Sequence, residues 1–230
     1  MNTSRRRLLA KGAGALAAWC GVADAVAGGV GAAHFAHFAQ SVQFGESSTA
    51  KGDDGQSGLA ERLRAGGVII AFRHALAPGT FDPPGFNLED CRTQRNLNDE
   101  GRMQAARIGK WFRNHGLKPA QVLSSPWCRC LDTARIAFGT DAVVTWPALG
   151  SPRGTSELAY PDHQERLRKA AAQRRIAGGF EVWVTHMFVI QDLVGLGVGS
   201  AEALVLMSDP RAADRKALTV LGHWRLSATG

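Results

Sequence analysis

The chain has 230 residues, of which 45% are hydrophobic and 20% are charged. This is enough apolar material for one domain with a substantial core, and it excludes a wholly disordered chain. The formal net charge is +7, but no lysine-rich stripe with interleaved aromatic residues accompanies it, so the composition does not indicate nucleic-acid binding.

The first 27 residues have the pattern of an export signal. Arg5–Arg7 precede an apolar stretch, and Ala25–Ala27 fits the small-x-small cleavage pattern. Ser4–Leu9 also resembles a twin-arginine signal. An uncleaved membrane anchor is the alternative, although the run is short for a span of about 20 residues. Cleavage would remove four basic residues and one acidic residue and lower the net charge to +4, which suits an anionic substrate.

This signal predicts a periplasmic or otherwise exported protein. We therefore expect transient contact with the export machinery and no stable membrane insertion after cleavage. Residues 28–58 are rich in Gly, Ala and Ser and show no sustained period, so they are interpreted as a flexible linker. Residues 59–230 are expected to form the folded domain.

Short apolar runs alternate with amphipathic segments in that domain, which predicts an α/β fold. The all-apolar run VIIAF (68–72) is typical of a parallel strand covered on both faces. We expect a three-layer α/β/α sandwich with a mostly parallel, doubly wound sheet. The expected strands are 68–72, 121–125, 141–146, 181–185, ALVLMS (203–208) and LTVLGHWRL (218–226). The last of these is expected at an edge of the sheet. The expected helices are 59–66, 99–115 capped by Asn98, 126–138 capped by Ser125, 161–175 and one ending at about Leu196.

Two histidines and two arginines follow these strands. Arg73 and His74 close the first strand, His186 follows the fourth, and Arg129 lies about one turn into the helix after the second. The carboxyl ends of parallel strands form the ligand-binding edge of such sheets. For Arg73 and His74 to reach one ligand, the strand must break at about Phe72, because adjacent strand residues point to opposite faces.

These residue types suit a phosphoryl group. Arginine presents a planar fork of donors to the spread negative charge. A neutral imidazole can attack phosphorus and form a phosphohistidine, while a second, protonated histidine stabilises the transferring oxygens. The pattern requires no metal and no cofactor.

Export would leave three cysteines in an oxidising compartment, enough for one disulfide and one free thiol. Cys91 with Cys128 is the preferred pair, and Cys91 with Cys130 is the alternative. The Cys-x-Cys spacing without a nearby histidine pair does not match a zinc site.

Four segments, in order, resemble the histidine phosphatase superfamily, also called phosphoglycerate mutase-like: FRHA (72–75), LNDEGRMQAARIG (97–109), VLSSPWCRCLDTA (122–134) and VTH (184–186). The resemblance implies that His74 is the phosphorylated nucleophile. It also implies that Arg73, Arg129 and His186 bind the phosphate.

Three positions depart from that pattern. Ala75 replaces the usual glycine after the histidine, and Thr80 falls near the place of an asparagine often found there, which makes it a candidate substrate-binding residue. Met187 follows His186, so the His-Asp pair of the phytase-like branch is missing. LNDEG favours the smaller, mutase-like branch 1.

The leaving-group acid and the substrate contacts are less defined. Glu157 is the carboxylate best placed to protonate an alcohol leaving group, and Asp82 is its rival. Gln94, Arg95 and Asn96 bring dense hydrogen-bonding capacity just before a helix, where they could face the substrate or cap the helix and fix the loop; of these, Gln94 and Asn96 are candidate substrate-binding residues.

The sequence therefore predicts an exported, metal-independent phosphomonoester hydrolase that acts through phospho-His74. Its partner would be a small phosphoester, such as a sugar phosphate. The alternatives are a non-catalytic protein that binds phosphate or a sugar phosphate, and a phosphohistidine protein phosphatase.

Overall fold

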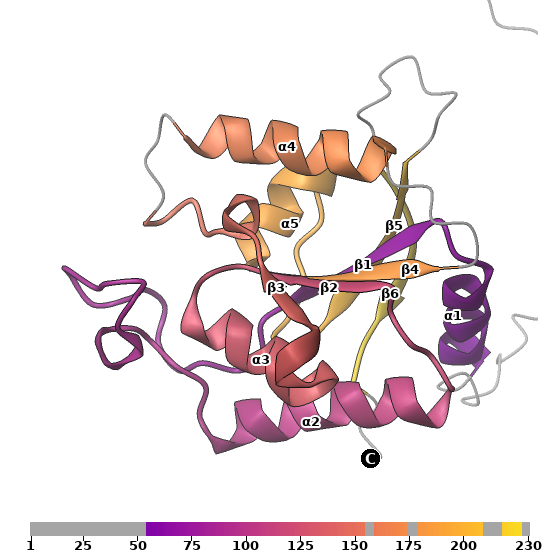
Figure 1. Cartoon of the computed structure of the whole chain (residues 1–230), viewed down its shortest axis with the longest axis horizontal. Coiled ribbons are helices and arrows are strands. Elements are labelled where there is room, and N and C mark those ends of the chain that lie inside the picture. The colour runs from indigo at the N-terminus through magenta and orange to yellow at the C-terminus, as the bar shows by residue number, and fades with distance from the viewer. Residues whose placement is uncertain (1–53, 155–158, 174–178, 209–217, 227–230) are drawn as a thin grey trace, which may run out of the picture. The chain divides into compact units, whose positions relative to one another are not determined.

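The computed structural model describes residues 54–154, 159–173, 179–208 and 218–226. The expected signal (1–27), nearly all of the expected linker and Glu157 lie outside these ranges. The described residues form a mixed α/β fold (Figure 1). Its helices are α1 (Asp54–Ala65), α2 (Asp99–Asn114), α3 (Cys128–Phe138), α4 (Tyr160–Gln173) and α5 (Met187–Val194), with short 3₁₀ turns at Cys91–Thr93, Thr140–Ala142 and Pro147–Leu149. Its strands are β1 (Val68–Arg73), β2 (Gln121–Ser124), β3 (Val143–Thr145), β4 (Phe180–Thr185), β5 (Ala203–Ser208) and β6 (Leu218–Trp224).

These strands form one sheet in the order β3-β2-β4-β1-β5-β6. Strands β1 to β4 are parallel, whereas β5 runs antiparallel to β1 and β6 runs antiparallel to β5 at the edge. Arg73 lies opposite Thr185, and Ser124 lies opposite Val184. This register brings His74, Ser125 and His186 out together, each one residue past its strand.

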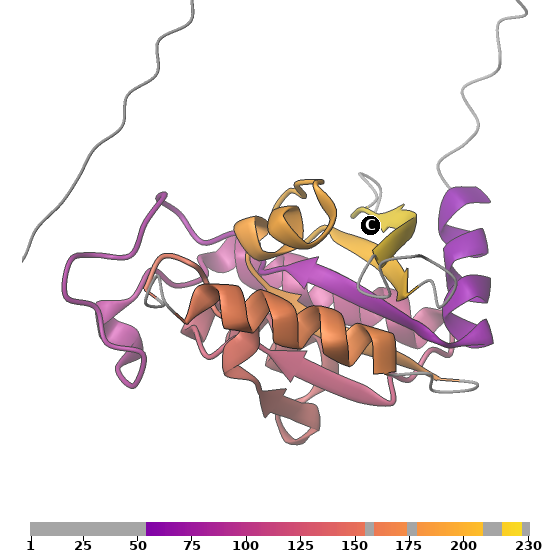
Figure 2. The same ribbon diagram turned by 90° about the horizontal axis from the view of Figure 1, so that it is seen from above.

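Helices cover both faces of the sheet. Figures 1 and 2 show α4 and α5 over one face and α2 and α3 over the other. Strand β1 contributes Val68, Ile70 and Phe72 to the core beneath α2 and α3, and Ile69 and Ala71 to the core beneath α4 and α5. Burial on both faces explains why the sequence of β1 is continuously apolar.

The predicted fold class is confirmed, with several boundary differences. Helix α1 begins at Asp54, so 54–58 is helical rather than part of a linker. Strand β3 is shorter than expected, and α5 ends at Val194. No helix of the described residues is long and apolar enough to cross a membrane.

The helix after β2 begins later than predicted, at Cys128, and Ser125 is not its cap. The Ser125 amide donates to the Val184 carbonyl, which extends the strand-like pairing by one residue. The Ser125 hydroxyl instead contacts His186 Nε2 at 2.8 Å. The side chain predicted to cap a helix therefore belongs to the site.

Candidate active site

His74 is held rigidly just past the end of β1. Its backbone amide donates to the Thr185 carbonyl at 2.9 Å, and its carbonyl accepts from the Ala201 amide at 3.2 Å. Its ring nitrogen Nδ1 lies 2.8 Å from the Ala75 carbonyl oxygen. Because a carbonyl oxygen only accepts, Nδ1 carries the proton, and Nε2 therefore keeps its lone pair. The strand continues through Arg73 rather than breaking at Phe72 as predicted.

The surroundings of His74 keep its imidazole neutral. The side chain is buried, and burial lowers its pKa well below the usual value; Arg129 and Arg73 lower it further. The hydrogen bond to Ala75 opposes this only in part. A neutral imidazole with a free Nε2 lone pair is the form that attacks phosphorus.

His186 lies beside His74, with ring centroids 5.5 Å apart. Its Nε2 contacts the Ser125 hydroxyl, and the Trp127 ring packs against it at 5.1 Å. Burial lowers the pKa of His186 well below its usual value, and His74 and Arg129 add to the effect. Protonation of His186, which the sequence argument expects while it stabilises the transferring oxygens, would therefore require a bound anion nearby.

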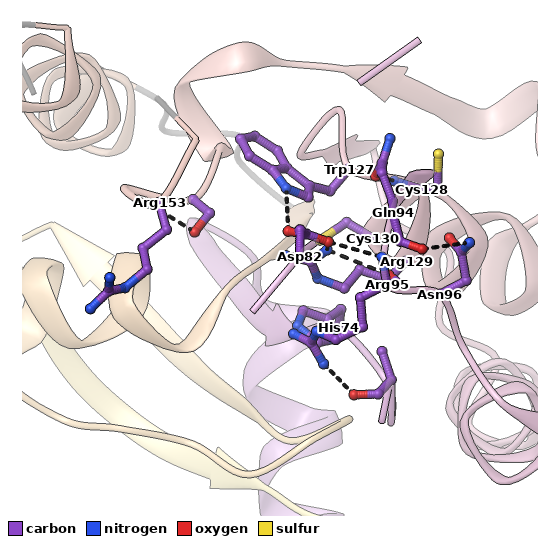
Figure 3. Close-up of polar contacts among 12 residues, drawn as sticks. His74, Asp82, Gln94, Arg95, Asn96, Trp127, Cys128, Arg129, Cys130 and Arg153 are labelled. Atoms are coloured by element: carbon purple, nitrogen blue, oxygen red, sulfur yellow. Dashed lines mark hydrogen bonds and ion pairs between the residues drawn. The ribbon is translucent and has the colours of Figure 1, made fainter. Parts of the chain in front are cut away.

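Arg129 forms a buried ion pair with Asp82. Its Nη1 lies 2.8 Å from Asp82 Oδ1, and the two side chains are 4% and 6% exposed. Asp82 also accepts from the Arg95 amide and from Trp127 Nε1 (Figure 3). Burial raises the pKa of Asp82, but these three donors outweigh it and leave the pKa below its usual value. Asp82 is thus an ionised carboxylate that orients Arg129.

Arg73 and Arg95 complete the cationic surroundings of His74. Arg73 donates from Nη1 to the Val198 carbonyl at 3.2 Å, and Arg95 donates to the Ala77 carbonyl. Burial lowers the pKa of both guanidinium groups. In Arg73, Arg95 and Arg129 the buried Nε–H finds no acceptor among the described residues. These arginines therefore retain donors for an anion.

A pocket of about 460 Å³ opens over these residues and contains Arg73, His74, Arg129 and His186 together. The sequence argument thus placed all four correctly at one sheet edge. Thr80 and Asp82 also line the pocket, and so does Arg95 of the polar run 94–96. Other lining residues, among them Arg153, Phe81 and Phe188, were not singled out by the sequence argument. Among the described residues, no cluster of three His, Cys, Asp or Glu side chains could hold a metal ion.

Residues 69–174 match the sequence model of the histidine phosphatase superfamily, branch 1. This part of the chain belongs to the superfamily. The match contains His74 and Arg129, and it supports phosphatase activity. No curated protein matches the chain.

Three solved structures of low sequence identity are also similar to the chain. A protein named phosphohistidine phosphatase SixA, from Agrobacterium tumefaciens, has 19% identity and a TM-score of 0.47, covering 70% of this chain and 98% of its own. An α-ribazole phosphatase from Shigella flexneri has 14% identity and a TM-score of 0.47, with coverage of 66% and 94%. A phosphoserine phosphatase mutant from Entamoeba histolytica has 13% identity and a TM-score of 0.49, with coverage of 68% and 95%.

The segment LNDEGRMQ (97–104) holds the loop that follows His74. Gln104 Oε1 accepts from the Leu76 amide at 2.9 Å. Gly101 packs directly against Leu76, since a Cβ at this position would lie 2.1 Å from the Leu76 carbonyl oxygen. Any larger residue at this position would displace the loop from α2.

The Thr-Ala end of the SSPxxR segment ties the same loop to α3. Thr133 Oγ1 accepts from the Ala75 amide at 3.0 Å and donates to the Arg129 carbonyl at 2.7 Å. One hydroxyl thus links the backbones of the residue after His74 and of Arg129. Ala75 is fully buried, and its methyl side chain, at a position where glycine is usual, leaves these contacts in place.

Gln94 and Asn96 fix a loop in the histidine phosphatase, and neither lines the pocket. Gln94 Oε1 accepts from the Cys128 amide at the start of α3, and its Nε2 donates to the Asn87 carbonyl. Asn96 Nδ2 donates to the Cys91 carbonyl. The loop-fixing alternative, rather than the substrate-binding one, describes both residues.

A disulfide joins Cys91 to Cys128, the preferred pair, over a sequence separation of 37 residues. Cys130 is the free thiol and is fully buried. Its Sγ lies 3.5 Å from His186 Nε2, and burial raises its pKa to about 12, so it packs as a neutral thiol. The disulfide fastens the 87–96 loop to the residue before Arg129.

Proposed function

We propose that this histidine phosphatase is a metal-independent phosphomonoester hydrolase that acts through a covalent phosphohistidine at His74. The observation that carries the proposal is the hydrogen bond from His74 Nδ1–H to the Ala75 carbonyl. It leaves Nε2 as the nucleophile in a neutral ring surrounded by Arg73, Arg95 and Arg129. Fixed cations at the position where phosphoryl charge develops stabilise the transition state without reorganisation.

Two steps account for the reaction. In the first, the Nε2 lone pair forms a bond to phosphorus, the ester P–O bond breaks, and the alcohol leaves with a proton from a general acid. In the second, water attacks phosphorus, the N–P bond breaks, and inorganic phosphate leaves. The water proton returns to the acid residue, and the His74 lone pair is regenerated.

Glu157 is the proposed acid. Asp82 is unsuited to this role, because it accepts three hydrogen bonds in its ionised form and its lowered pKa leaves it without a proton near neutral pH. A general acid needs a pKa close to the working pH. Asp82 instead acts through Arg129, which it orients.

The proposed setting is outside the cytoplasm, and the proposed substrate is a small phosphoester such as a sugar phosphate. The basic and then apolar start of the sequence supports export. The Cys91–Cys128 disulfide also supports it, since disulfides persist mainly in oxidising compartments.

Hydrolysis of an aryl phosphate by purified protein tests the proposal. We expect turnover that persists in EDTA and falls by at least roughly a thousandfold in His74→Ala. His115→Ala is the matched control, because His115 lies at the end of α2 and is not among the pocket residues. Phosphate binding without turnover would instead indicate a binding protein. Turnover restricted to phosphohistidine peptides would indicate a phosphohistidine protein phosphatase.

A further inference from the structure

Arg153 lies in the pocket but apart from the groups around His74. It lines the same cavity and is exposed, whereas His74 and Arg129 are each only 3% exposed. Figure 3 shows its side chain away from the cluster of His74, Asp82 and Arg129. Arg153 therefore belongs to the outer part of the pocket, where the portion of a substrate beyond its phosphate would lie.

The backbone of Arg153 is fixed. Its amide donates to the hydroxyl of the buried Ser151 at 3.2 Å. The next residue, Gly154, has a φ of +104°, and a Cβ there would lie 2.6 Å from Phe86 and 2.9 Å from Trp127. Only glycine combines this backbone conformation with so close an approach. The segment is thus clamped against the pocket wall, with Arg153 at a defined position.

The Arg153 guanidinium is oriented by an aromatic ring rather than by a carboxylate. Its Cζ lies 4.4 Å from the centroid of Phe81, a cation–π distance. None of the described carboxylates forms an ion pair with it. Among the described residues, its side-chain donors thus have no carboxylate partner and can bind an anionic group, while the stacking limits the positions that the side chain adopts.

The charge of the pocket exceeds what one phosphate needs. Its described lining contains four arginines (Arg73, Arg95, Arg129 and Arg153) and one carboxylate, Asp82. A phosphate monoester carries about two negative charges at neutral pH. A bound monoester without further charge would therefore leave positive charge uncompensated, and Arg153 is the exposed cation among these four arginines.

We infer that the natural substrate carries a second anionic group on its alcohol portion and that Arg153 binds this group. The inference rests on the proposed phosphatase function and names its substrate class. Phe81 and Phe188, which are 54% and 38% exposed and both line the pocket, offer apolar surface for the part of the substrate between its two anionic groups. A carboxylate and a second phosphate both have the negative charge and the acceptor oxygens that a guanidinium binds.

The test uses three aryl phosphates that differ only in a remote group. Para-(carbamoylmethyl)phenyl phosphate carries a neutral amide, the carboxymethyl analogue a carboxylate, and the phosphonomethyl analogue a phosphonate. The methylene insulates the phenol, so the leaving groups are closely matched. Each is assayed with the wild type, with Arg153→Gln and with the control Arg102→Gln, which removes an exposed charge on α2.

We expect the wild type to prefer a charged ester over the amide by about tenfold in kcat/KM at low salt, the value of one charge-assisted contact. Arg153→Gln should abolish that preference and leave turnover of the amide within about twofold of the wild-type rate. Arg102→Gln should retain the preference for the charged esters. The carboxylate and phosphonate arms show which anion the site prefers. Equal rates for all three esters in the wild type, or a preference retained in Arg153→Gln, would overturn the inference.

Binding separates this inference from the proposed function. Dissociation constants of the same esters are measured calorimetrically on His74→Ala, which cannot form the covalent intermediate. A charge preference in binding without turnover by the wild type would uphold the second anion site and refute the phosphatase proposal. Turnover without any charge preference would support the phosphatase proposal and refute the second anion site.

Discussion

Asp82 Oδ1 lies 2.8 Å from Arg129 Nη1, and both side chains are almost fully buried. Asp90 and Arg92 form a second Asp–Arg pair, also at 2.8 Å, but there Arg92 is 89% exposed. Two pairs of the same chemistry thus differ in burial. The buried pair orients a guanidinium in the pocket that contains His74, and the exposed pair lies on a surface loop.

Asp82→Asn should destabilise the protein by about 3 kcal/mol, because it leaves the buried Arg129 charge without a carboxylate. Asp90→Asn should cost less than about 1 kcal/mol, as is usual for an exposed pair. Denaturant unfolding of both variants measures the contrast. Equal losses of unfolding free energy would show that burial does not set the strength of the Asp82–Arg129 pair.

The identity of the general acid can be read from leaving-group dependence. Glu157→Gln should lower kcat for an alkyl phosphate by about 10²- to 10⁴-fold while sparing para-nitrophenyl phosphate, whose leaving group needs little protonation. Asp82→Asn should lower activity on both esters, because it disturbs Arg129. Loss of alkyl turnover alone in Asp82→Asn would reassign the acid to Asp82.

The Cys91–Cys128 disulfide should stabilise both the fold and the pocket. A disulfide that closes a loop of 37 residues lowers the entropy of the unfolded chain, which stabilises the folded protein by about 4 kcal/mol. Cys91→Ser should lose stability of this order and raise KM, since the loop of Gln94 would loosen at the start of α3. Reductant should reproduce the change in the wild type and have no effect on Cys91→Ser. If thiol titration of the exported protein found three free cysteines, the disulfide would be absent and this stabilising role would be refuted.

The two buried histidines should make the fold sensitive to mild acid. Their pKa values are lowered by burial, so below the ordinary value of 6.5 protons bind the unfolded chain in preference to the folded one. Stability is therefore expected to fall as the pH decreases from 6.5 towards the folded-state values. Each histidine should contribute roughly 1 kcal/mol to the loss of stability between about pH 7.5 and pH 5.5.

Unfolding free energies at these two pH values test this directly. In His74→Asn, the change in unfolding free energy between these pH values should be smaller than in the wild type by the contribution of one histidine. His115→Asn is the control, because no comparable burial accompanies that residue. An unchanged pH dependence in His74→Asn would mean that folding does not lower the pKa of His74.

Sequence reasoning was strongest where the pattern is local. The apolar runs predicted β1 and β4, and their parallel pairing follows from the alternation with helices. Arg73 and His74 at the end of β1, His186 after β4 and Arg129 near the start of α3 were assigned to one edge, and all four line one pocket. Antiparallel β5 and β6 follow the same apolar pattern as parallel strands, so their direction depends on pairing that periodicity does not reveal.

The remaining site residues depend on contacts between distant segments. Asp82 meets Arg129 across 47 positions of sequence, and Ser125 meets His186 across 61. No local period marks such pairs, and Ser125 followed by Pro126 has the same pattern as a helix start. Of the dense polar run at 94–96, only Arg95 reaches the pocket, whereas Gln94 and Asn96 bind backbone groups.

Rapid-quench trapping of the phosphorylated enzyme tests the central claim most directly. Protein mixed with an aryl phosphate labelled at phosphorus, quenched in alkali and digested should yield one labelled peptide, with acid-labile phosphate on His74. His74→Ala should yield none. Turnover at a normal rate without labelled protein, or label on a residue other than His74, would contradict the account.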